Sequence, residues 1–113
     1  ANDGDPVLAV GRQLRHMAAL SGSMLRNAVR AADEMDPGLA RSVLERDAEL
    51  DAEFAAALRL VMTYVLQDHR FLRPTIDTIF ALKGLERIGD HATNIAEQVL
   101  YMMGQDRQQA DAA

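Results

Sequence analysis

The chain has 113 residues, enough for one modest domain with one core; apolar residues make up 49% of it and aromatic residues 4%. Ala, Leu, Met and Val must therefore fill the interior, which favours close-packed helices over a sheet. The formal net charge of −5 disfavours general nucleic-acid binding, and the lack of cysteine excludes disulfides, thiolate metal sites and cysteine nucleophiles.

The first predicted helix begins at Asp5-Pro6, where an acidic N-cap precedes a proline suited to the first helical position. Apolar residues then recur at helical spacing as far as Met35. The Asp-Pro-Gly sequence at residues 36–38 ends this helix and caps the next one.

The outward side of the first helix carries a group of arginines that we call the arginine face. Its members are Arg12, Arg15, Arg26 and Arg30. No acidic residue occurs between Pro6 and Asp33, so this side is basic in an acidic protein. Two interpretations stay open: a docking surface for an acidic partner, or an ordinary solvated helix face, which we favour slightly.

The second predicted helix runs to about Leu66, and a polar break at residues 67–70 follows. Asp68 is placed to cap the third helix, and Pro74 lies close enough to its start to be tolerated. The third helix runs to about Met103, with Gly104 as its C-terminal stop.

Three helices of about 25 to 30 residues with short connections predict an all-α fold, an antiparallel up-down-up three-helix bundle. We expect residues 1–104 to form the bundle and residues 105–113 to form a polar C-terminal tail. No apolar run approaches the ~20 residues needed to span a bilayer, and the first residues do not resemble a signal peptide. We therefore expect a soluble, cytoplasmic protein.

The third helix carries a stripe of oxygen-bearing side chains, Glu86, Asp90, Asn94 and Glu97. The residues expected on its buried side, roughly opposite, are Leu85, Ile88, Ala92, Ile95, Val99 and Met102. Like charges four residues apart repel each other, and a hard cation bound by oxygen ligands would relieve that repulsion.

Two glycines flank this stripe, Gly84 and Gly89. Each costs about 1 kcal/mol relative to alanine inside a helix. Close approach of a neighbouring helix would explain both, and simple tolerance of the cost is the alternative.

A second acidic pair, Asp47 and Asp51, lies on the second helix. Asp47 falls in the middle of the apolar stripe formed by Val43, Leu50 and Phe54, where a lone carboxylate is costly unless it is paired or coordinated. We predict that the acidic pairs of the two helices meet at a seam and bind metal. The predicted ligands are Asp47, Asp51, Glu86 and Asp90, with Asn94 and Glu97 as additional candidates. The alternative is solvated acidic faces that pair with Arg46, Lys83 and Arg87.

No catalytic motif is present. Glu-x-x-His, His-Glu-x-x-His, a glycine-rich phosphate loop and Gly-x-Ser-x-Gly are all missing from the sequence. His91 points about 100° away from Asp90, and His16 and His69 have no acidic or serine companions at useful spacing. We assign none of these histidines a role.

Three segments together resemble the PhoU family. They are MAALSGSMLRNAV at residues 17–29, VLERDAELDAEF at residues 43–54 and LERIGDHATNIAEQVLYMMGQ at residues 85–105. The resemblance covers nearly the whole chain and is most specific in the third segment. That family is built from two three-helix repeats, and this chain looks like the second, so we expect a C-terminal half of a longer protein.

The resemblance implies a regulatory adaptor and not an enzyme. Such a protein couples the ATPase subunit of the phosphate ABC transporter to a sensor histidine kinase and represses the phosphate-starvation response. Some members bind metal clusters through acidic pairs that match the four predicted ligands, and iron, zinc, manganese and magnesium stay open. We expect a homo-oligomer such as a dimer, with membrane contact only through partners.

Two other functions are considered beside the adaptor. One is the cytoplasmic PhoU-like domain of a sodium-phosphate cotransporter. The other is a metal hydrolase, which is disfavoured because the carboxylates have no paired histidine and no evident pocket.

Overall fold

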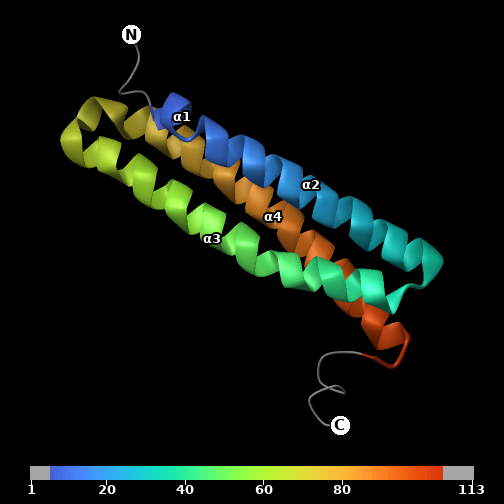
Figure 1. Cartoon of the computed structure of the whole chain (residues 1–113). Helices are drawn as coiled ribbons and strands as arrows, with labels where there is room; N and C mark the ends of the chain where they lie inside the picture. Colours follow the sequence, from blue (N-terminus) through green and yellow to red (C-terminus); the bar gives the residue numbers. More distant parts are fainter. Residues whose placement is uncertain (1–5, 106–113) are drawn as a thin grey trace.

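The computed structural model describes residues 6–105, and within them every regular element is a helix (Figure 1). The elements are α1 (Pro6–Ala9), α2 (Gly11–Glu34), α3 (Pro37–Gln67), the 3-10 helix η1 (His69–Phe71) and α4 (Leu72–Met102). α2, α3 and α4 lie side by side with alternating direction (Figure 1), and each packs against the other two. The predicted up-down-up three-helix bundle is confirmed. The cap Asp5 and residues 106–113 of the predicted tail lie outside the described residues.

The turn between α2 and α3 forms where the Asp-Pro-Gly sequence predicts it. Met35 adopts a left-handed conformation with φ 52°, and its N–H donates to the carbonyl of Ala31, which closes α2. The Asp36 carboxylate accepts a hydrogen bond of 3.1 Å from the N–H of Leu39, while Pro37 occupies the first turn of α3.

The other helix ends agree with the prediction in part. α4 ends at Met102, and Gly104 takes a positive φ of 68° beyond it, as a helix stop requires. The first helix is not continuous, because the chain turns at the fully buried Val10 between α1 and α2. Asp68 caps η1 through the N–H of Arg70, and α4 starts only after that turn.

The core is built from Ala, Val, Leu and Met side chains, as the composition predicts. Its largest fully buried members are Met17 and Met24 from α2, Leu50 and Val43 from α3, and Leu82 and Val99 from α4. One predicted core position is wrong: Met102 is 61% exposed, because α4 ends there and no helix covers it.

The two glycines of α4 have different surroundings. Gly89 is buried, and a Cβ at that position would overlap the Leu50 Cδ2 atom and lie 3.9 Å from Met24 Cε. The predicted close approach of neighbouring helices is therefore confirmed at Gly89. It is wrong for Gly84, where a Cβ would meet no atom within 4 Å.

Candidate functional site

α3 and α4 run antiparallel, and a contact near their middle sets their register. The Lys83 ammonium of α4 lies 5.2 Å from the ring centroid of Phe54 on α3. Asp51 lies one turn before Phe54 on α3, and Glu86 lies one turn after Lys83 on α4. Because the helices are antiparallel, both acids lie on the same side of the contact. The structure therefore brings the two predicted acidic pairs to one seam.

We call this group the acidic seam, and it comprises Asp47, Asp51, Glu86, Asp90 and Glu97. Asp47 is half-buried at the inner edge, and the Glu86 side chain is 21% exposed beside it. Asp51, Asp90 and Glu97 are exposed along the outer edge. Asn94 is also exposed, and it faces further from the core than the acids do. The seam is thus a solvent-facing surface and not a core site.

The carboxylates of the seam act on one another electrostatically. Burial raises the pKa of Asp47, and the negative charges of Asp51, Asp90, Glu86 and Glu97 raise it further, in that order. Burial likewise raises the pKa of Asp51, with Glu86 and Asp90 adding to it. Lys83 lies 3.2 Å from the Glu86 carboxylate. Lys83 is at one end of the seam and, among the described residues, pairs with Glu86 alone, so the seam keeps a local excess of negative charge.

The seam has the ligand atoms of a hard-cation site, but these atoms are not arranged around a common point. All its donors are oxygen atoms, which suits magnesium, manganese and iron best. Within residues 6–105, no group of three or more His, Asp or Glu side chains is close enough to hold a metal ion as positioned. Metal binding by Asp47, Asp51, Glu86 and Asp90, with Asn94 and Glu97 as further candidates, therefore requires side-chain rotation and stays a prediction.

The other half of the α3/α4 face is apolar. Beyond Phe54 and Lys83, towards the connection between α3 and α4, large apolar side chains are exposed to solvent. We call them the apolar patch: Met62, Leu66, Leu72, Ile76 and Phe80. Leu66 is 83% exposed and Phe80 72% exposed. A contiguous exposed apolar patch is a common feature of protein–protein contact surfaces.

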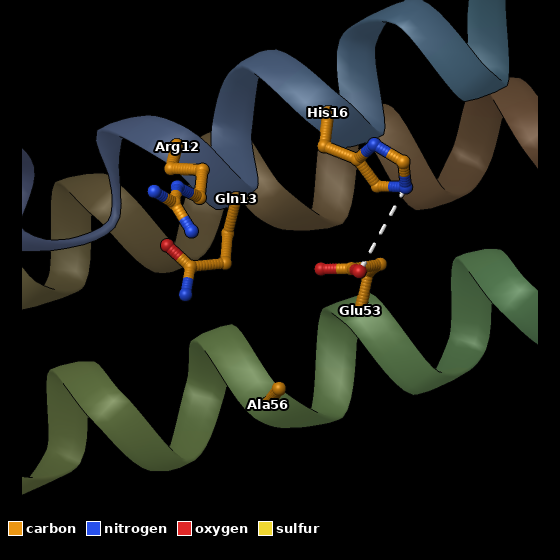
Figure 2. Close-up of a pocket in the computed structure, with 5 residues that line it drawn as sticks. All are labelled: Arg12, Gln13, His16, Glu53 and Ala56. Carbon is orange, nitrogen blue, oxygen red and sulfur yellow. Dashed lines mark ion pairs between the residues drawn. The ribbon is translucent and has the colours of Figure 1, made fainter.

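A pocket between α2 and α3 contains a group of charged side chains centred on His16, which the sequence pattern did not predict. Figure 2 shows His16 of α2 opposite Glu53 of α3, with His16 Nε2 3.7 Å from Glu53 Oε1. The same nitrogen is 3.9 Å from Glu49 Oε2. Arg12 and Gln13 line the same open pocket. The sequence showed no companion for His16 because both glutamates come from a different helix.

The comparison with protein families covers the same residues that build the seam. The family model described as PhoU domain matches residues 14–99, which include all five acids of the acidic seam. The chain belongs to the PhoU family. This membership agrees with the resemblance drawn from the three quoted segments and with the three-helix fold.

Curated relatives carry the same family name. The chain is 43% identical over 98 residues to a phosphate-specific transport system accessory protein PhoU homolog of Xylella fastidiosa (strain Temecula1), covering 87% of this chain and 41% of the relative. Homologs with that name from Rhizobium meliloti and Pseudomonas aeruginosa are 40% and 41% identical, covering 82% and 80% of this chain and 39% and 38% of the relatives. The chain thus spans about two fifths of their length. No solved structure gives a significant match.

Among the described residues, no helix combines the length and the apolar character that crossing a bilayer requires.

Proposed function

We propose that this PhoU domain is a cytoplasmic regulatory adaptor in bacterial phosphate sensing. It couples the ATPase subunit of the phosphate ABC transporter to a sensor histidine kinase and represses the phosphate-starvation response when phosphate is ample. One observation carries this proposal: the face formed by α3 and α4 joins the acidic seam to the exposed apolar patch. The relatives' name, which refers to a phosphate-specific transport system, supports it.

This face has the two properties that a reversible protein contact needs. The apolar patch provides the area whose removal from water drives association. The acidic seam provides charge complementarity, which fixes orientation and accelerates encounter with a basic partner surface. We assign the domain no catalytic step, and its contact with the membrane is through its partners. The names of the relatives favour the adaptor over the domain of a sodium-phosphate cotransporter.

Binding to the purified transporter and to the cytoplasmic part of the kinase tests the adaptor function. Phe80→Ser with Leu66→Ser should weaken binding at least about tenfold, because two exposed anchors are lost. Glu86→Ala with Asp90→Ala should weaken binding and derepress a phosphate-starvation promoter while leaving the helical circular dichroism intact. Val29→Ser, at an exposed apolar position on α2 and so outside this face, is the matched control. Unchanged binding and unchanged repression in both pairs would refute the proposal.

We further propose that the acidic seam binds a metal ion or cluster, with iron, zinc, manganese and magnesium as candidates. A bound cation would supply positive charge where the carboxylates now repel one another. Elemental analysis of protein purified without chelators should find metal that Asp47→Asn with Glu86→Gln removes. Glu45→Gln with Asp77→Asn changes two exposed carboxylates outside the seam and should retain the metal. If wild-type protein contains no metal even after incubation with each candidate ion, the metal-binding proposal is refuted.

A further inference from the structure

The arginine face of α2 is exposed along its length, and the adaptor function does not use it. At about 100° per residue, Arg12, Arg15, Arg26 and Arg30 fall within an arc of about 60° that points away from the core. Arg30 pairs with Glu34 at 3.2 Å. Within residues 6–105, the other three arginines form no ion pair. The domain therefore presents an uncompensated basic surface despite its net charge of −5.

Two glycines let the guanidinium groups of this face lie close to the helix. A Cβ at Gly11 would be 3.3 Å from Arg15 Nη1, and a Cβ at Gly22 would be 3.3 Å from Arg26 Nη1. Each glycine precedes its arginine by one helical turn. Between Arg15 and Arg26 the exposed residues are Ala18 and Ala19, which are small, and His16, which turns towards α3. The face is consequently low in relief, so another helix can approach it closely.

The complementary surface is present on the same molecule. Arg15 and Arg26 are eleven positions apart on α2, and Glu86 and Glu97 are eleven positions apart on α4. Both spacings correspond to about 16 Å along a helix. Arginine suits this role because its planar guanidinium binds carboxylates with two parallel hydrogen bonds. Such contacts would offset the mutual repulsion of the carboxylates gathered along the seam.

One copy cannot bring these two surfaces together by itself. α2, α3 and α4 each pack against the other two, so the α3/α4 seam lies across the core from the outer side of α2. We propose that the arginine face of α2 binds the acidic seam of a second copy of this chain. The contact is head-to-tail, because it joins two different surfaces. Each added copy therefore leaves one surface free for the next copy, whereas a two-fold symmetric contact would form only a dimer. It depends on the two charged surfaces and not on the adaptor function.

Sedimentation velocity over a range of protein concentrations tests the contact, with a chelator present so that no metal occupies the seam. At about 50 mM salt the wild-type chain should form dimers and larger species in a concentration-dependent series. At about 500 mM salt the association constant should fall at least about tenfold, because salt screens exposed charges. A wild-type chain that is monomeric at low salt, or association that high salt leaves unchanged, would overturn the proposal.

Charge reversal identifies the two surfaces. Arg15→Glu with Arg26→Glu should abolish self-association, and so should Glu86→Arg with Glu97→Arg. Mixing the two variants should restore it, because the reversed surface of one variant then matches the reversed surface of the other. Arg59→Glu with Arg73→Glu is the matched control, since it makes the same change in net charge at exposed positions outside both surfaces. Equal loss in this control, or no recovery on mixing, would refute the assignment.

Discussion

Gly89 of α4 packs directly against the Leu50 side chain of α3. A Cβ at position 89 would overlap Leu50 Cδ2, and the same Cβ would touch Met24 of α2. Gly89 is therefore the point at which α4 approaches both other helices, and it lies beside the acidic seam. The spacing of the three helices at the seam depends on this one missing side chain.

Gly89→Ala should destabilise the domain by roughly 1–2 kcal/mol. The overlap with Leu50 costs about 1–3 kcal/mol, and the better helix propensity of alanine returns part of it. Gly84→Ala is the control, because a Cβ there meets nothing within 4 Å. That variant should be more stable by about 0.5–1 kcal/mol. Urea denaturation of both variants measures the difference, and equal stabilisation by both would contradict the packing described for Gly89.

Asp47→Asn should stabilise the metal-free domain at neutral pH by a few tenths to about 1 kcal/mol, since it removes a half-buried charge from a repulsive group. The folded-state pKa of Asp47 is raised, so the native state binds more protons between the ordinary value of 3.8 and the raised value. Wild-type stability therefore falls as the pH rises through that window. Urea unfolding between about pH 4 and pH 7 should show a smaller fall in the variant. The exposed Glu45→Gln serves as the comparison, and a steeper fall in Asp47→Asn would contradict this account.

A metal ion bound at the seam should reverse that ranking. A ligand that binds only the folded state at about one hundred times its dissociation constant stabilises it by about 2.7 kcal/mol. Thermal unfolding with added manganese, iron, zinc or magnesium should thus show a higher Tm for wild type. Asp47→Asn should lose most of that increase, whereas Glu45→Gln should keep it. An increase of the same size in both variants would place the ion elsewhere.

Asp68 should control the order of the connection between α3 and α4. Its carboxylate accepts hydrogen bonds from the Arg70 backbone and side chain, and these lower its pKa to about 2. This support is complete above the ordinary pKa and is lost as the pH falls towards about 2. In Asp68→Ala the amide hydrogens of η1 should exchange faster at neutral pH, while Asp68→Asn should retain part of the protection. Unchanged exchange in the alanine variant would show that the cap is dispensable.

Helix periodicity and capping residues were sufficient to predict the fold. The Asp-Pro-Gly turn and Gly104 mark helix ends by backbone chemistry that acts locally, so the sequence alone indicates them. The break at Val10 was not predicted. Its position in the core depends on packing between helices, which no short sequence window contains.

The sequence predicted that the two acidic pairs meet at a seam, but helix spacing by itself fixes positions only within one helix. Spacing on one helix places Glu86 next to Asp90, but the relative rotation and register of α3 and α4 decide whether Asp47 joins them. The Phe54–Lys83 contact and the packing at Gly89 fix that register. The His16–Glu53 pair was missed for the same reason, since its members are distant in sequence and meet only in the bundle.

Lys83 lies at the border between the acidic seam and the apolar patch, with its ammonium near both the Phe54 ring and the Glu86 carboxylate. A partner that places an apolar segment on one half must therefore pass this cation before its basic residues reach the other half. Reversing the partner would put its basic residues over apolar side chains and leave the seam unmatched. The face is consequently directional, and a partner segment with one apolar end and one basic end matches it in only one polarity.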